Sequence, residues 1–320
     1  MNTFKEELAT KVSILYYEEN NNQNEIASKL GISRSYVSQL LSYARSHNIV
    51  RIVVNVDGFY SHSVKEEIEF SKYFPEVKQF YFMKSKSPEY TKKYIGKFAA
   101  PLVSELIKKS NIIAIDPGTS VQRIIKELRP NLFKNCQNKV ILPSIGGIDN
   151  ENVKVCPNDL VRKLGQIVNC KYLFLNSPAV IANYHLRDAL LKEKNIQDVI
   201  SYWDKIELDI FGIGNVKEGS ILFSLLSRNM IQEVKNSKAV GETQINFFDK
   251  EGNYLPLLEK YRIGLPLEKL RKINMKVSIA FGKEKALAIT SILKAKLIDV
   301  LITDSITVHA MEKYLKDFRK

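Results

Sequence analysis

The chain has 320 residues but only three cysteines, and none of them stands in a C-x-x-C pair. Cys136, Cys156 and Cys170 are far apart in the sequence. This spacing disfavours both a structural zinc site and a disulfide-stapled scaffold, which need closely spaced or numerous cysteines. Incidental thiols of this kind fit a reducing compartment, so we expect a cytoplasmic protein.

Long apolar runs are also missing. No stretch approaches the roughly 20 uninterrupted apolar residues that a membrane helix needs. Residues 1–11 lack the apolar core of a signal peptide. We therefore expect no membrane partner.

The net charge of +13 does not by itself predict DNA binding, because residues 1–60 carry six basic and six acidic side chains. The positive excess therefore lies in the C-terminal part of the chain. There it suits an anionic ligand or long-range attraction of DNA, and equally a lysine-rich solvated surface.

Three helices are predicted near the N-terminus, over residues 4–19, 23–30 and 34–46, from apolar side chains at helical spacing. Gly31 supplies the turn before the third helix, and Ser33 stands at its N-cap position. Two helices joined by so tight a turn are typical of a helix-turn-helix, in which the second helix of the pair enters the major groove.

Polar side chains occupy the outer face of the third predicted helix: Arg34, Ser35, Tyr36, Ser38, Gln39 and Ser42. We predict that Arg34 and Gln39 read base edges, and that residues 35, 36 and 38 make phosphate or mixed contacts. The alternative is a plain helical hairpin used for packing or dimerisation.

Beyond residue 54, strand and helix patterns alternate. Seven apolar runs suit buried strands, at residues 79–83, 111–116, 139–145, 171–176, 208–214, 276–282 and 299–304. Helical stretches separate most of them, at residues 88–109, 120–129, 158–169, 284–296 and 305–317. The sequence therefore predicts an all-α helix-turn-helix domain over residues 1–54, then a doubly wound, mostly parallel α/β domain over residues 55–320.

Small residues follow several of these strands, where open α/β sheets bind their ligands. Gly118, Thr119 and Ser120 precede a predicted helix, whose backbone N–H groups and dipole favour a phosphate. Further glycines at strand ends are Gly146, Gly147, Gly212, Gly214 and Gly282. Each glycine alone fits an ordinary turn, but together they predict one cleft for an anionic metabolite.

Residues 15–54 resemble the DNA-binding head of the SorC family of sugar-responsive bacterial transcription regulators, with LYY, EIA, LG-x-SR and VS-x-LL in that order. Asn48 replaces the usual glycine before Ile49 and Val50, and asparagine tolerates the same left-handed conformation. The resemblance continues through a G-T-S turn, a P-x-x-GG segment, a P-A pair, a GIG strand end, an FFD-x-E-G segment, a KA pair and LIDVLITD. These motifs stand at residues 118–120, 143–148, 177–179, 209–214, 247–252, 281–286 and 297–304.

The resemblance implies a C-terminal fold similar to sugar-phosphate isomerases and deaminases, serving as a sensor of a phosphorylated sugar or polyol without a further cofactor. It also implies a double-stranded DNA operator and a homo-oligomer, a dimer or a tetramer. Gly118, Thr119 and Ser120 would cradle the phosphate and Lys285 would supply a cation. Ile145 stands where some relatives hold an aldehyde sugar through a Schiff-base lysine, so covalent capture of that kind is not expected.

The competing hypothesis is an active sugar-phosphate isomerase or deaminase with an appended DNA-binding head. Its acid–base candidates are Asp116, Asp149 and His185. No H-x-H, no paired carboxylates at fixed spacing and no Ser/His/Asp set accompanies them, so we predict a sensor and not an enzyme. A protein–protein module without a ligand would leave the strand-end glycines unexplained. The sequence does not determine whether ligand releases DNA or promotes its binding.

Overall fold

The computed structural model describes residues 3–50, 62–148, 155–217 and 221–315. Its contacts divide the chain into two compact units, residues 1–59 and residues 60–320. The predicted domain boundary between residues 54 and 55 lies outside the described residues. No helix in the described ranges is both long and apolar enough to cross a membrane.

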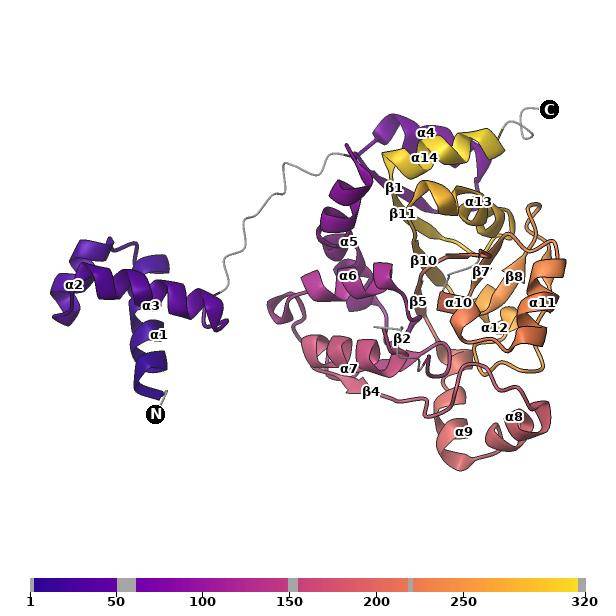
Figure 1. Ribbon diagram of the computed structural model, residues 1–320, viewed down its shortest axis with the longest axis horizontal. Helices are drawn as coiled ribbons and strands as arrows, with labels where there is room; N and C mark the ends of the chain where they lie inside the picture. Colours follow the sequence, from indigo (N-terminus) through magenta and orange to yellow (C-terminus); the bar gives the residue numbers. More distant parts are fainter. Residues whose placement is uncertain (1–2, 51–61, 149–154, 218–220, 316–320) are drawn as a thin grey trace. The chain divides into compact units, whose positions relative to one another are not determined.

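The N-terminal unit is all α and consists of α1 (Thr3–Tyr17), α2 (Gln23–Leu30) and α3 (Arg34–Ser46) (Figure 1). Gly31 ends α2 in the left-handed conformation, with a φ of 64°. Ser33 caps α3, because its side chain accepts a hydrogen bond from the backbone N–H of Tyr36 at 3.1 Å. Asn48 also adopts a left-handed conformation, with a φ of 59°. The predicted turn and cap are thus present.

The core of this unit lies between α3 and its two neighbours. Val37, Leu40, Leu41 and Ala44 recur at helical spacing on α3 and are all buried, as is Ile26 of α2. The predicted inner face of α3 is therefore the packed face, and the opposite face stays open to solvent.

A seven-stranded sheet forms the centre of the C-terminal unit, in the order β1-β11-β10-β5-β2-β3-β4 with every neighbouring pair parallel. Its strands are β1 (Gln79–Met83), β2 (Ile112–Ile115), β3 (Val140–Pro143), β4 (Lys171–Tyr172), β5 (Leu208–Phe211), β10 (Met275–Ile279) and β11 (Val300–Asp304). Each strand overlaps one of the seven predicted apolar runs, and the predicted parallel α/β architecture is confirmed.

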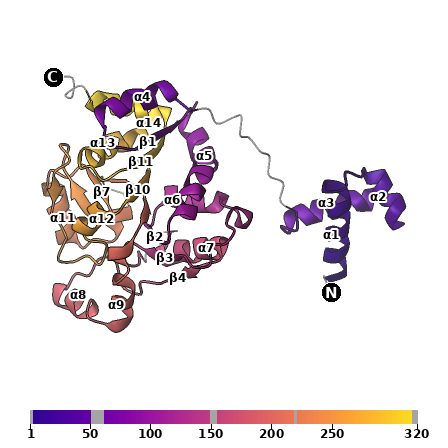
Figure 2. The same ribbon diagram turned by 180° about the vertical axis from the view of Figure 1, so that it is seen from behind.

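Helices cover both faces of this sheet (Figures 1 and 2). One face packs against α5 (Pro88–Lys109), α6 (Thr119–Glu127) and α7 (Pro157–Val168). The other packs against α4 (Val64–Tyr73), α9 (Lys194–Ile200), α12 (Leu267–Lys272), α13 (Ala286–Lys294) and α14 (Ser305–Met311). Successive strand residues point to opposite faces, so Ile113 and Ile115 of β2 join the first core and Ala114 joins the second. The remaining helices are α8 (Tyr184–Leu190), α10 (Ile221–Ser224) and α11 (Arg228–Asn236).

A small antiparallel sheet that the sequence did not predict lies after β5. Its order is β6-β7-β8-β9, with β6 (Gly214–Asn215), β7 (Gly241–Thr243), β8 (Asn246–Phe248) and β9 (Tyr254–Leu255). The predicted strand over residues 208–214 was too long, because Gly214 pairs with Glu242 of β7 and not with the main sheet. The predicted strand over residues 171–176 was also too long, because β4 at the sheet edge ends at Tyr172, and beyond it the backbone N–H of Leu173 still donates to the carbonyl of Ile141 at 2.9 Å.

The strand order of the main sheet reverses between β2 and β5. After β2 the chain adds β3 and β4 on one side of it, and then adds β5, β10 and β11 on the other side, where β11 pairs with the earlier strand β1. The connections that leave β2 and β5 therefore run apart at their carboxyl ends, next to Asp116 and Gly212. Such a switch point is where doubly wound sheets form a ligand crevice.

Candidate functional site

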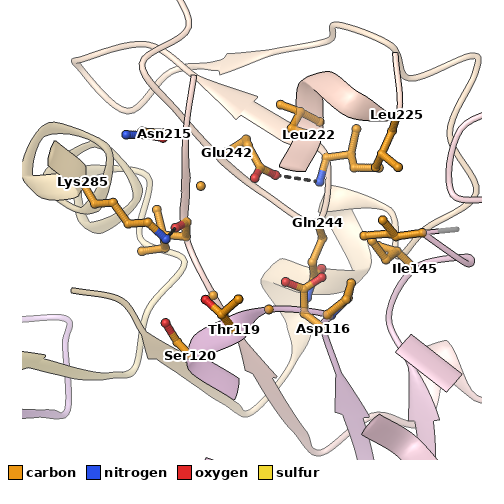
Figure 3. A pocket seen from close by; sticks show the side chains of 17 residues that line it. Asp116, Thr119, Ser120, Ile145, Asn215, Leu222, Leu225, Glu242, Gln244 and Lys285 are labelled. Carbon is orange, nitrogen blue, oxygen red and sulfur yellow. Dashed lines mark hydrogen bonds between the residues drawn. The ribbon is translucent and has the colours of Figure 1, made fainter. Parts of the chain in front are cut away.

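A cavity of about 290 Å³ lies at this switch point (Figure 3). Six of the eight predicted effector residues line it: Gly118, Thr119, Ser120, Gly212, Gly214 and Lys285. They come from the start of α6, from the end of β5, from β6 and from the turn before α13. Parallel strands with their carboxyl ends at one edge bring these distant segments together.

The two other predicted residues, Gly146 and Gly147, do not line this cavity. A Cβ added to Gly146 would lie 2.6 Å from the carbonyl oxygen of Pro178. The backbone N–H of Gly147 donates to the carbonyl of Ser177 at 2.6 Å. The glycine pair thus lets two chain segments approach closely, and the neighbouring Ile145 lines the cavity in its place.

The N-terminus of α6 opens onto the cavity. Gly118 is the N-cap and has no side chain, so the first backbone N–H groups of α6 receive no side-chain cap. Thr119 and Ser120 add two hydroxyls at the same helix end. Uncapped N–H groups and the positive end of a helix dipole form a site that favours an anion.

Lys285 lines the same cavity, and its side chain reaches toward this helix end (Figure 3). Its Nζ donates to the carbonyl oxygen of Ile213 at 2.7 Å. Burial lowers the pKa of Lys285, while Glu242 and Glu284 act in the opposite direction. Lys285 carries the only ammonium or guanidinium group among the described lining residues.

Sequence reasoning missed the β7–β8 hairpin, which contributes Glu242, Gln244 and Ile245 to the cavity. The two turn residues, Gln244 and Ile245, have φ values of 51° and 60°. Such turns usually contain glycine or asparagine, so this hairpin carries no turn signal in its sequence. A β-branched residue with a positive φ is strained, typically by about 1–3 kcal/mol, and is held by its surroundings. Here the backbone N–H of Ile245 donates to Glu242 Oε2 at 3.1 Å, and Arg262 Nη1 donates to the carbonyl of Gln244 at 3.2 Å.

Buried carboxyl groups lie beneath and beside the cavity. Asp116 lines it and accepts hydrogen bonds from the Ser144 hydroxyl at 3.5 Å and from the backbone of Gly212. Burial, followed by the nearby charges of Glu242 and Asp209, raises the pKa of Asp116 well above its usual range. Burial likewise raises the pKa of Asp209 to about 7, although Gln244 Nε2 donates to its Oδ2 at 2.5 Å.

The three acid–base candidates of the enzyme hypothesis do not come together. Asp116 lies in the cavity, whereas His185 is exposed on α8 and is not a lining residue. Asp149 lies outside the described residues. No described histidine lines the cavity, so Asp116 has no imidazole with which to exchange a proton there.

The predicted DNA-reading residues share the solvent face of α3. Arg34, Ser35, Ser38, Gln39 and Ser42 are exposed, and Tyr36 is half-buried. Their positions alternate with the buried residues of α3, so the helix packs one face and presents a polar one.

Comparison with known proteins agrees with both units. A family model described as "Putative sugar-binding domain" matches residues 60–311, and one described as "Sigma-70, region 4" matches residues 10–47. The sorbitol operon regulator of Klebsiella pneumoniae is 24% identical over 314 residues, which cover 96% of this chain and 98% of that protein. Its full-length crystal structure shares the fold, with a TM-score of 0.70, 24% identity, and coverage of 95% of this chain and 98% of that chain. This chain belongs to the SorC family of transcription regulators.

Other relatives of this SorC-family chain are also named as regulators. The deoxyribonucleoside regulator of Bacillus subtilis (strain 168) is 26% identical over 315 residues, which cover 97% of this chain and 99% of that protein. A transcriptional regulator from Streptococcus pneumoniae TIGR4 shares the fold over 78% of this chain and 96% of its own, with a TM-score of 0.72 and 23% identity. The chain is accordingly a transcription regulator with a helix-turn-helix and a sugar-binding domain, and not an enzyme.

Proposed function

We propose that this regulator binds a double-stranded DNA operator through α3, and that a phosphorylated sugar or polyol bound in the cavity controls its affinity for the operator. The observation that carries the proposal is the cavity at the switch point, where the uncapped start of α6 faces Lys285. Backbone N–H groups, the hydroxyls of Thr119 and Ser120, and one ammonium group form a donor set suited to a phosphate.

The names of the relatives support a carbohydrate-related effector. One relative is named for sorbitol and another for deoxyribonucleosides. The two names differ, so they support the class of ligand and not its identity.

The proposal includes a homo-oligomer, a dimer or a tetramer, that presents two α3 helices to two half-sites of the operator. A ligand changes DNA affinity only if it binds one arrangement of the subunits better than another. The measurable consequence is a shift in operator affinity, of either sign, when ligand saturates the cavity.

Thermal-shift measurements on the full chain test the ligand half of the proposal. Ribose 5-phosphate, 2-deoxyribose 5-phosphate, glucose 6-phosphate, fructose 6-phosphate, ribulose 5-phosphate and sorbitol 6-phosphate are each compared with the unphosphorylated compound. A ligand at about 100 times its Kd stabilises the native state by about 2.7 kcal/mol, which raises Tm measurably. We expect at least one phosphorylated compound to raise Tm while its free counterpart does not. A panel without any such shift contradicts the proposed ligand class.

Two substitutions locate the binding site. Thr119→Ala and Lys285→Ala should each weaken binding of the active compound by about tenfold or more, because a hydrogen bond to a charged group contributes about 1.5–3 kcal/mol. Lys283→Ala is the matched control, since Lys283 is exposed in the same turn as Lys285 and does not line the cavity. If Lys283→Ala and Lys285→Ala lose the same amount of binding affinity, the phosphate does not bind beside Lys285.

DNA binding is tested with operator fragments selected from a random library by the full chain. Fluorescence anisotropy then gives operator affinity with and without the active compound. A change of about fivefold or more corresponds to the coupling free energies usual for allosteric proteins, about 1–3 kcal/mol. If the affinity for the operator is unchanged at saturating ligand, ligand binding does not control DNA binding and the proposal is contradicted.

A further inference from the structure

A strongly basic surface lies at the carboxyl end of β1 and along the first turns of α5. Residues 84–97 carry five lysines and one glutamate, so five positive charges less one negative charge leave a net charge of +4. All five lysines are exposed. We call them the lysine surface: Lys84, Lys86, Lys92, Lys93 and Lys97.

Two of these lysines share one face of α5 with two tyrosines. Tyr90, Lys93, Tyr94 and Lys97 recur at i, i+3, i+4 and i+7, so they lie on the same side of the helix. The tyrosine rings are half-buried, with their centroids 4.6 Å apart, and Lys93 Nζ lies 5.1 Å from the centroid of the Tyr94 ring. Lysine and tyrosine side chains are among the groups that contact phosphate oxygens in protein–DNA interfaces. This face therefore has the composition of a phosphate-binding surface.

The ammonium groups of the lysine surface form no ion pair with any residue that the structure describes. Other lysines of the same unit do have carboxylate partners. Lys108 Nζ lies 2.6 Å from Glu105 Oε1, and Lys269 Nζ lies 2.7 Å from Asp204 Oδ2. The positive charge of the lysine surface is thus not offset by such pairs, and it attracts a polyanion.

The chain that leaves the helix-turn-helix enters the C-terminal unit beside this surface. The ring of His62 packs against that of Phe98, with centroids 4.9 Å apart, and Phe98 directly follows Lys97 on α5. The backbone N–H of Ser63 donates to the carbonyl of Phe82 in β1 at 2.8 Å. The start of this unit is therefore fixed against β1 and α5, at the edge of the sheet that carries the lysine surface (Figure 1).

The connection from the DNA-reading unit to this edge is short. Twelve peptide units join Val50 to His62, and at about 3.6 Å each they span at most about 43 Å. Duplex DNA carries one phosphate charge about every 1.7 Å along its axis. A duplex bound by α3 therefore presents many phosphates within reach of the tethered lysine surface.

The DNA-reading unit itself supplies no net positive charge, because residues 1–60 carry six basic and six acidic side chains. The sequence-independent part of DNA affinity comes from lysines and arginines that neutralise phosphates and release their counterions. The lysine surface provides such charge on the other unit of the same chain.

We propose that the lysine surface is a second DNA contact, at which the C-terminal unit binds backbone phosphates of the duplex that α3 reads. The contact is with phosphates and not with base edges, because a lysine ammonium acts as a point charge on a flexible stem. This inference goes beyond the proposed function, in which α3 alone contacts the operator. It adds affinity that is independent of base sequence and falls steeply with salt.

The test measures the salt dependence of DNA affinity by fluorescence anisotropy, using the full chain. The probes are the operator selected from the random library and a duplex of unrelated sequence and the same length. One variant combines Lys93→Ala with Lys97→Ala. Each lost phosphate contact reduces the slope of log affinity against log salt by about 0.9, so the double variant should lose about 1.8 of the slope and bind about tenfold more weakly. Both duplexes should lose affinity by a similar factor, because phosphates carry no sequence information.

A variant that combines Arg271→Ala with Lys272→Ala is the matched control. Both side chains are exposed at the end of α12, just before β10, and so lie at the amino ends of the parallel strands, opposite the lysine surface. The control removes the same charge and should keep the slope of the wild type. An equal loss in the two variants would show that net charge attracts DNA from a distance, and it would overturn the inference.

Two other results would overturn the inference as well. One is an unchanged slope and affinity in the variant with both α5 lysines replaced. The other is a lower molecular mass of that variant by light scattering, which would assign these lysines to subunit assembly. Each of these results leaves the proposed roles of α3 and of the cavity standing. If the wild type binds neither duplex, the DNA-binding half of the proposed function fails and the inference fails with it.

Discussion

The two units of this regulator build their functional surfaces in opposite ways. The predicted DNA-reading face comes from six positions within nine consecutive residues of one helix, from residue 34 to residue 42. The cavity instead collects side chains from residue 116 to residue 285, carried by two different sheets. Helical spacing therefore determines the first surface, while sheet topology and a hairpin determine the second.

The interiors of the two units also differ in how many polar and charged side chains they bury. The described core of the N-terminal unit is almost entirely apolar, with Ser13 as its buried polar side chain. The C-terminal unit buries Asp116 and Asp209 next to the cavity. The N-terminal core is stabilised by apolar packing. In the C-terminal unit, burial of the two carboxyl groups is unfavourable, and it occurs where a polar ligand is proposed to bind.

The largest expected effect is on the pH dependence of stability in the C-terminal unit. Because burial raises the pKa of Asp209 from 3.8 to about 7, the folded state holds this proton more tightly than the unfolded state. Its contribution is complete below about pH 4 and is lost as pH rises through about 7, by an amount on the order of 4 kcal/mol. Asp209→Asn should flatten this decline, measured by urea denaturation between pH 4 and 8. The exposed Asp188→Asn is the control, and an equal slope in Asp209→Asn and the wild type would show that Asp209 does not titrate in this way.

The next effect is a core truncation in the N-terminal unit. Leu40→Ala removes a fully buried side chain between α3 and its neighbours. It should lower the free energy of unfolding of this unit by about 3 kcal/mol and abolish operator binding with it. Gln39→Ala, its exposed neighbour, should change stability by less than about 0.5 kcal/mol. Circular dichroism during denaturation measures both, and equal effects would show that helical spacing does not determine the packed face.

Substitutions at two glycines that both follow predicted strands should have different effects in the C-terminal unit, one on stability and the other on ligand binding. Gly146→Ala places a Cβ 2.6 Å from the Pro178 carbonyl oxygen and should cost about 2 kcal/mol of stability. Gly212→Ala meets its nearest atom, the Ile279 carbonyl oxygen, only at 4.0 Å and should fold normally. Its methyl group would nevertheless narrow the cavity and weaken binding of the active sugar phosphate. Thermal denaturation measures the stability of both variants, and calorimetry measures their ligand binding. A stable Gly146→Ala and an unstable Gly212→Ala would contradict these assignments.

The smallest expected effect is on DNA recognition by single side chains. Arg34→Ala and Gln39→Ala should each weaken binding to the selected operator by about tenfold, or about 1–2 kcal/mol, and relax the choice of base at one position. Thr10→Ala, on an exposed position of α1, serves as the control. Anisotropy titrations against the operator and its single-base variants measure the effect. Uniform weakening across all variants would indicate phosphate contacts and not base readout.

Much of the fold followed from local patterns. Seven apolar runs predicted the seven strands of the main sheet, and Gly31 and Ser33 predicted the turn and cap of the helix-turn-helix. Strand lengths were less predictable, because pairing partners end β4 and β5 earlier than the apolar runs do.

The sequence predicted some of the residues that line the cavity and missed others. Gly118 and Lys285 carried recognisable motifs, whereas Glu242 and Gln244 lie on three-residue strands and at a turn without glycine. The motif at Gly146 predicted a cavity-lining residue. In the structure this glycine instead allows the close approach of the Pro178 backbone.

The sequence by itself determined the three N-terminal helices, the seven strands of the main sheet and the apolar face of α3, because those properties depend on side chains a few positions apart. The tertiary structure alone decided the order of strands, and with it the switch point between β2 and β5 where the cavity lies. It also decided that Glu242 and Gln244 line the same cavity as Lys285. Their approach depends on contacts between segments more than a hundred residues from Asp116 in the chain, and no local pattern encodes such contacts.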